Sequence, residues 1–147
     1  MKKLLVGAVL LVCAGFVAFF VKDMIDRQHP EYAVTQLTVT ADTKDVAVIV
    51  AGFDWAFPFG GRAKREAADI VEQYPVPSVL LGGEKLELIF SQPIISLSVR
   101  RSESYSYALS DIGGDLTVPF ENGAYLYEVN ASFEQGSVLY YFYILVE

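Results

Sequence analysis

The feature that most constrains this chain is an uncharged apolar segment near its N-terminus. Residues 4–21 are eighteen residues long and read LLVGAVLLVCAGFVAFFV, with Lys2 and Lys3 before them and Lys22 directly after. At about 1.5 Å per residue, a helix of this length extends about 27 Å, which is close to the hydrocarbon thickness of a bilayer, about 30 Å. We therefore expect a helix that enters a membrane.

The segment has three possible fates after insertion. An uncleaved anchor is favoured, because apolar residues continue from Phe16 to Val21, beyond the small residues at which a signal peptide could be cut after Ala14. A cleaved signal peptide is the second possibility. The third is lipid attachment at Cys13 after cleavage, although Val12 stands where a lipobox normally has Gly, Ala or Ser. A single-pass protein of the cell membrane with its C-terminal domain outside is expected, and the alternatives are a secreted or lipid-anchored form.

The chain accordingly divides into three expected parts. Residues 1–28 form the membrane anchor or signal segment, residues 29–35 a linker, and residues 36–147 an extracytoplasmic domain. From Glu31 onward there are seven basic and sixteen acidic residues, a net charge of −9. Nucleic acid is an improbable partner for such a surface, because phosphate binding requires a basic stripe.

The scarcity of cysteine and histidine limits the catalytic mechanisms and metal sites that the chain could have. Cys13 is the one cysteine and His29 the one histidine. A disulfide framework and a cysteine-based zinc site are excluded, and little is left for a Ser-His or Cys-His mechanism. We expect no catalytic residues, no metal site and no cofactor.

Beyond the linker, the apolar residues adopt the two-residue period of β-strands. Leu37, Val39 and Ala41 alternate with threonines, for example. The expected strands cover residues 37–41, 46–50, 79–81, 85–90, 95–100 and 104–107. Short strands separated by turns are typical of an antiparallel β-sandwich. The exception is 62–74, where apolar residues follow helical spacing up to Pro75 and predict one short helix inserted into an all-β domain.

The last hairpin is the clearest expected element. Apolar and polar residues alternate over much of residues 123–133, residues 137–146 form an apolar and aromatic run, and Glu134-Gln135-Gly136 reverses the chain between them. The final strand is apolar on both faces, so it is expected to be central in its sheet or covered on both sides. Tyr125 or Tyr127 is a candidate for a tyrosine corner, in which a hydroxyl bonds to the backbone at a sheet crossover.

At this hairpin the sequence resembles a group of small exported or membrane-anchored proteins of Gram-positive bacteria, often lipoproteins. The resemblance covers about residues 46–147 and is strongest in the last thirty or so. Phe133 stands where a Trp is more usual in the group. The resemblance implies an immunoglobulin-like exported domain and no known activity. The matching residues are Gly52, Trp55, Asp69, Pro75 or Pro77, Gly123, Tyr125, Tyr127, Val129, Ala131, Phe133, Gly136, Tyr140, Phe142 and Val146.

The candidate ligand-binding residues are Trp55, Phe57 and Phe59, which lie in an aromatic stretch between Gly52 and Gly61. Exposed, these rings could bind a peptide, a glycan or a lipid head group, because aromatic side chains bury much area at small entropic cost. The alternative is that Trp55 fills the space between two sheets and its neighbours line it.

Two other clusters have structural explanations that we favour over functional ones. Asp111 and Asp115 flank two glycines, but calcium needs more than two carboxylates, so a hairpin turn is expected there. The basic clusters at 62–65 and 100–101 are expected to be solvated positions.

The favoured function is a non-enzymatic binding or accessory module at the cell surface, tethered by the N-terminal helix and able to take a protein or peptide partner. Two alternatives remain open. One is a carboxylate-dependent hydrolase, because any two acidic side chains could meet in the fold. The other is a partner subunit of another membrane protein, paired through small residues of the helix between Gly7 and Ala18.

Overall fold

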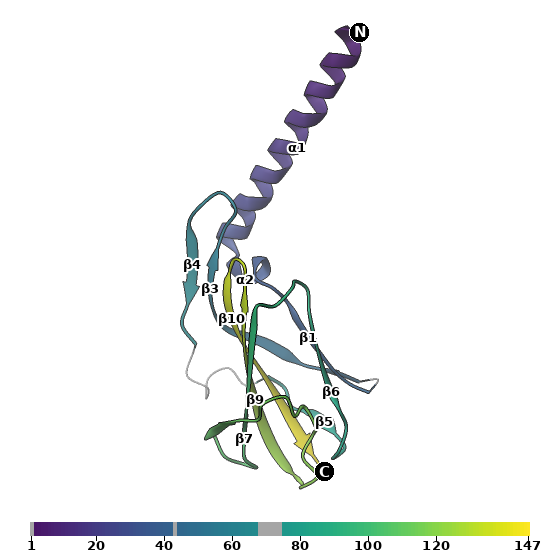
Figure 1. Ribbon diagram of the computed structural model, residues 1–147, viewed down its shortest axis with the longest axis vertical. Coiled ribbons are helices and arrows are strands. Elements are labelled where there is room, and N and C mark those ends of the chain that lie inside the picture. The colour runs from purple at the N-terminus through teal and green to yellow at the C-terminus, as the bar shows by residue number, and fades with distance from the viewer. Residues whose placement is uncertain (1, 43, 68–74) are drawn as a thin grey trace.

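A long helix precedes a β-sheet domain in the computed structural model, which describes residues 2–42, 44–67 and 75–147 (Figure 1). Helix α1 spans Lys2–Gln28, and the short helix α2 spans Pro30–Ala33. Every side chain from Val6 to Lys22 is exposed. In the described part of the chain, one helix segment, Val6–Gln28, is long and apolar enough to cross a membrane, a property that signal sequences share. The predicted N-terminal apolar helix is confirmed.

Ten strands make up the described part of the domain. They are β1 (Leu37–Ala41), β2 (Lys44–Val46), β3 (Val48–Ala56), β4 (Arg62–Arg65), β5 (Ser78–Leu80), β6 (Leu86–Phe90), β7 (Ser96–Ser102), β8 (Leu109–Asp111), β9 (Gly123–Phe133) and β10 (Gly136–Val146). The prediction of a mostly β domain is confirmed.

The strands form two sheets. The smaller has the order β2-β1-β6, and the larger has the order β4-β3-β10-β9-β7-β8, with β5 pairing with the end of β10. All strand pairs described are antiparallel except β5 with β10. Both sheets contribute side chains to one hydrophobic cluster, so the core lies between them.

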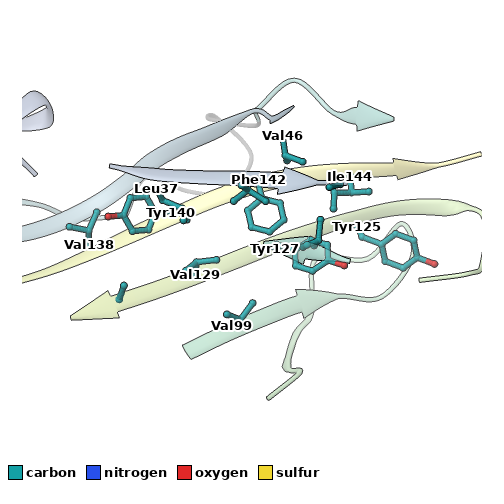
Figure 2. Packing of buried hydrophobic residues seen from close by; sticks show 14 of the residues in the cluster. Leu37, Val46, Val99, Tyr125, Tyr127, Val129, Val138, Tyr140, Phe142 and Ile144 are labelled. Carbon is teal, nitrogen blue, oxygen red and sulfur yellow. The ribbon is translucent and has the colours of Figure 1, made fainter. Parts of the chain in front are cut away.

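The centre of that core is built by cross-strand neighbours on β9 and β10 (Figure 2). Tyr127 and Phe142 are paired in register, and their rings stack with centroids 4.7 Å apart. Val129 pairs with Tyr140 one step along the hairpin. All four are fully buried, and burying such side chains is the main source of stability in a domain without a disulfide.

The last strand is central, as its two apolar faces predict. Strand β10 lies between β9 and β3. Its inner face joins the main core, and Tyr141 on its outer face belongs to a second small buried cluster with Ala51 and Leu126. The predicted turn before Gly136 is also confirmed.

The helix predicted for 62–74 is wrong over its first part, and residues 68–74 lie outside the described residues. Arg62–Arg65 forms strand β4, which pairs with the end of β3 from Phe53 to Ala56. The tight turn between the two strands brings β4 back along β3, and ladder hydrogen bonds outweigh the weak helical spacing.

Two predicted strands also differ in their bounds. The run 46–50 is interrupted at Ala47, whose backbone N–H donates to Ser78 Oγ at 3.2 Å. The strand predicted at 104–107 is absent, because Tyr105 has a φ of 53° and turns the chain. A strand, β8, begins instead at Leu109.

Candidate functional site

The three aromatic candidates occupy different environments. Trp55, in β3, is only 3% exposed, and its ring contacts Phe133 edge to face with centroids 5.8 Å apart. Phe57, just after β3, is 7% exposed and belongs to the same core cluster. Phe59 is 44% exposed. The structure therefore does not bring the three rings together on one surface, and Phe59 alone is accessible.

Phe59 lies at the tip of the turn between β3 and β4. The Gly60 N–H donates to the Phe57 carbonyl at 3.1 Å, and the Phe57 N–H donates to Gly61. Pro58 occupies the position of this turn that favours its fixed φ. Gly60 and Gly61 have φ values of 85° and 88°, which glycine adopts without strain. These residues hold the Phe59 ring out from the domain.

The Phe59 ring contacts helix α1. It stacks on Phe20 with centroids 4.8 Å apart and an interplanar angle of 5°, and it meets Phe19 edge to face at 5.0 Å. Beside it, the Arg27 guanidinium carbon lies 5.5 Å from the centroid of the Phe57 ring. Arg27 also donates to Asp23 at 2.7 Å. The turn is thus packed against the C-terminal half of the apolar helix.

Cys13, the candidate for lipid attachment, is a free and exposed thiol on α1. It lies within the continuous helix Lys2–Gln28, with apolar residues on either side of it. Its surroundings are those of an exposed position on an apolar helix.

A second surface, an apolar groove, lies on the open side of the domain between β6 and β7. It has a volume of about 610 Å³. The ring of Phe90 lies within contact distance of Phe133 and Tyr140, at 5.9 and 6.1 Å between centroids, so it joins the groove to the core. The lining residues are Thr40, Asp42, Lys85, Leu86, Glu87, Leu88, Phe90, Ile94, Leu97 and Leu116. We call this surface the β6–β7 groove.

Two open strand edges border the β6–β7 groove. Strand β6 is the last strand of its sheet, and the described residues contain no strand paired with its outer side. The Leu86 N–H donates outward to the Leu116 carbonyl at 2.8 Å. Because backbone groups of alternate residues face the same side of a strand, those of Leu88 and Phe90 also face outward. On the other side, β8 pairs with β7 from Arg100 onward, which leaves the edge beside Leu97 uncovered by a strand in the described chain.

A polar recess of about 640 Å³ lies at the start of β9, lined in part by Arg101, Ser104 and Glu121. Next to it, the hydroxyl of Tyr125 donates to the Glu121 carbonyl at 2.9 Å. The sequence predicts such a bond from a tyrosine hydroxyl to the backbone at Tyr125 or Tyr127, and it is found at Tyr125. Its role is structural, because the bond closes the crossover leading into β9.

Burial shifts the pKa values of several tyrosine hydroxyls in the domain. Burial raises the pKa of Tyr140 well above its usual range. Burial also raises the pKa of Tyr127, against a smaller opposite effect of the Arg101 guanidinium. For Tyr141, burial and the nearby carboxylate of Glu128 both raise the pKa. All three hydroxyls are therefore neutral near pH 7. Those of Tyr140 and Tyr141 donate hydrogen bonds to the Thr35 carbonyl and to Glu128, whereas the buried Tyr127 hydroxyl has no hydrogen-bond partner among the described residues.

The acidic turn residues bond to their own backbone. Asp111 accepts from the Gly113 N–H at 2.7 Å, and Asp115 accepts from the Thr117 N–H at 3.1 Å. Hydrogen bonds from Thr117 hold the pKa of Asp115 below its usual range. These contacts are the ones expected of a hairpin turn. Within the described residues, no group of three or more His, Cys, Asp or Glu side chains could hold a metal ion.

The basic clusters are largely paired. Arg62 contacts Asp54 at 2.7 Å, and Lys64 contacts Glu66 at 2.5 Å. The bond to Glu66 raises the pKa of Lys64. Arg100 contacts Glu128 at 2.9 Å across the β7–β9 ladder.

The β6–β7 groove was missed by the sequence analysis. The sequence does contain the apolar residues of the groove: Leu88 and Phe90 precede Pro93, and Ile94 and Leu97 follow it. Alternation alone predicts that such side chains face a core. Only the pairing order of the strands reveals that β6 and β7 belong to different sheets and are not hydrogen-bonded to each other.

Comparison of the chain with protein-family models, with curated proteins and with solved structures found no match.

Proposed function

We propose that this chain is a membrane-tethered, non-enzymatic binding module that takes an extended segment of a partner protein in the β6–β7 groove. In this proposal, α1 anchors the chain in the cell membrane and the β domain lies outside. The observation that carries the proposal is an apolar groove bordered by two strand edges that no described strand covers.

The anchor is supported by the character of α1. Its exposed side chains from Val6 to Val21 are apolar on every side of the helix, whereas a helix that packs on a soluble domain is apolar on one stripe. Lys2 and Lys3 precede the apolar run, and basic residues favour the cytoplasmic side. The acidic domain that follows is then placed outside.

The domain is proposed to be an immunoglobulin-like β-sandwich. Three features support this: two sheets that share one core, a long C-terminal hairpin at the centre of the larger sheet, and a tyrosine corner at Tyr125. Domains of this type commonly serve as binding modules on cell surfaces. The fold supports the type of function only by analogy.

The groove suits an extended polypeptide. Outward backbone groups at Leu88 and Phe90 can pair with an added strand, which is a common mode of peptide recognition. Apolar side chains at Ile94 and Leu97 can receive alternate side chains of that strand. Leu97 is 41% exposed, so it is accessible without rearrangement.

The test places a photo-cross-linking amino acid at Leu97 of the full chain in intact cells, with Val79 as the matched control. Val79 is exposed on β5, which pairs with the C-terminal end of β10, and it does not line the β6–β7 groove. We expect a protein adduct from position 97 that is lost on Ile94→Asp, and none from position 79. Synthetic peptides that cover the cross-linked region should then slow hydrogen exchange at the amides of Leu88 and Phe90.

Three results would contradict the proposal. One is an equal yield of adduct at positions 79 and 97, and another is a peptide that binds without protecting the β6 amides. The third is release of the full chain from membranes by alkaline washing, because a spanning helix remains in the bilayer.

A further inference from the structure

The contact between the β3–β4 turn and α1 places a domain side chain at the depth of the apolar helix. Phe59 belongs to the β domain, yet its ring stacks on Phe20 and meets Phe19 edge to face. Its remaining surface, 44% of the residue, is exposed. Because Phe59 adjoins exposed apolar side chains of α1, it is part of a continuous apolar patch rather than a single scattered residue.

The depth of this contact follows from helix geometry. Lys22 is the first charged residue after the apolar run. Phe19 and Phe20 precede it by two or three residues, which is about 3 to 5 Å along a helix axis. If the charges that begin at Lys22 lie among the lipid head groups, the Phe59 ring lies just inside the hydrocarbon boundary. Phenylalanine is an apolar side chain suited to that depth.

Shallow apolar recesses adjoin Phe59 on the helix surface. The first has a volume of about 530 Å³ and is lined by Val12, Gly15, Phe16, Phe19 and Phe59. The second has a volume of about 410 Å³ and is lined by Phe20, Val21, Asp23, Met24, Arg27 and Phe59. The first is lined by apolar residues alone, four from the helix and Phe59 from the turn, so it has the chemistry and position to receive lipid acyl chains.

The charged residues around the turn do not form a binding site for anionic head groups. Arg27 lies over Phe57 and bonds to Asp23. On β4, the cations of Arg62 and Lys64 are each paired with a carboxylate. Little net positive charge is left to attract anionic head groups, so burial of apolar surface is the driving force that the geometry favours.

We propose that the β3–β4 turn is a second point of membrane contact, at which Phe59 inserts into the outer edge of the hydrocarbon layer beside α1. The inference rests on the proposed anchor, because it requires α1 to span the bilayer. Insertion gives the domain two attachment points, the helix and the turn. A domain attached at two points keeps a fixed orientation, and the β6–β7 groove is then presented at a fixed angle to the membrane.

The test uses the full chain in bilayer nanodiscs of neutral phosphatidylcholine that carry a lipid-borne spin-label quencher. A fluorophore is attached to a single cysteine at one of three positions: native Cys13, Phe59→Cys or Phe120→Cys, the last two in a Cys13→Ser background. Phe120 is the matched control, because it is also an exposed phenylalanine, 80% exposed. It precedes Gly123, which pairs with Val146 beside the C-terminus, and Figure 1 places that end of the chain away from the N-terminal end of α1.

We expect strong quenching at positions 13 and 59 and little at position 120. Because the attraction is apolar, quenching at position 59 should change little when part of the lipid is phosphatidylglycerol or when salt is raised. A second variant, Phe59→Trp, keeps the aromatic contact with α1. Its added tryptophan emission should be quenched by the same lipid, whereas the buried Trp55 of the unsubstituted chain should be quenched less.

The outcomes separate the two proposals. In one outcome, position 13 is quenched, but the fluorophore at position 59 is quenched no more than at position 120, and Phe59→Trp is quenched no more than the unsubstituted chain. This result would overturn the membrane contact of the turn and leave the anchor intact. Absence of quenching at position 13 would show that α1 is not in the bilayer, and the proposed anchor would then fail together with the contact that depends on it.

Discussion

The hydroxyl of Tyr140 donates a 2.6 Å hydrogen bond to the backbone carbonyl of Thr35, a residue 105 positions earlier in the chain. Tyr140 lies on the central strand β10, and Thr35 is buried between α2 and β1. The bond ties the segment that leaves the helix to the centre of the larger sheet. It therefore helps to fix where the domain begins relative to α1.

Replacement of Tyr140 by phenylalanine tests this connection. Tyr140→Phe leaves the Thr35 carbonyl without its donor in a buried environment, so the free energy of unfolding should fall by about 1 to 3 kcal/mol. Urea unfolding of the full chain in a non-ionic detergent, followed by near-UV circular dichroism, measures the loss. The control is Tyr32→Phe, at an exposed residue, which should change stability by less than about 0.5 kcal/mol. Equal effects of the two substitutions would contradict the prediction.

Substitution of the two phenylalanines that flank Pro58 should affect the stability of the domain to different extents. Phe57→Ser removes a buried ring from the core cluster and should lower the free energy of unfolding by about 3 kcal/mol or more. Phe59→Ser removes a ring that lies outside that cluster, so the stability of the β domain in detergent should change by less than about 1 kcal/mol. The same unfolding measurement compares the two, and a larger loss for Phe59→Ser would be inconsistent with the structure.

Gly136 is expected to be intolerant of any side chain. A Cβ atom added there would lie 1.9 Å from the carbonyl oxygen of Asp54, on the neighbouring strand β3. Backbone must move to relieve that overlap, so Gly136→Ala should destabilise the domain by at least about 1 to 3 kcal/mol. The matched control is Gly114→Ala, because a Cβ at Gly114 meets no atom within 4 Å. Thermal unfolding of the two variants checks the difference, and similar midpoints would show that the hairpin packs differently.

Stability should decline in alkaline solution because of the buried tyrosines. Burial raises the pKa of Tyr127 and Tyr140 above the ordinary value of 10.0. The unfolded chain therefore releases these protons at lower pH than the folded chain, and the free energy of unfolding falls as pH rises above about 10. Below that pH their contribution is fully present. In urea unfolding across this range, Tyr140→Phe should show a shallower decline than the unsubstituted chain, and an identical slope would argue against the burial effect.

Much of the larger sheet could be predicted from local pattern. Alternation in residues 123–133, followed by a turn and the apolar run 137–146, predicts the β9–β10 hairpin, because period two places one set of side chains on one face of a sheet. The apolar character of both faces of β10 predicts its central place. The uncharged run 4–21 predicts α1 by length and composition alone.

The sequence-based predictions of secondary structure are wrong where tertiary contacts outweigh a weak local preference. Ala63 lies in a segment with helical spacing, yet it pairs with Trp55 in a β ladder. Strand edges left open by the pairing order, such as that of β6, leave no trace in the pattern of one sequence. The β6–β7 groove was missed for that reason.

The sequence by itself determined that an apolar helix precedes an acidic, mostly β domain. A continuous run of apolar residues and an alternation of apolar with polar residues each permit few backbone arrangements. Tertiary structure alone decided which aromatic rings are buried. Trp55, Phe57 and Phe59 alternate along one short stretch, but the turn at Pro58 leaves the first two in the core and sets the third against Phe19 and Phe20. Burial depends on what packs against a residue from distant parts of the chain, and that information is not local.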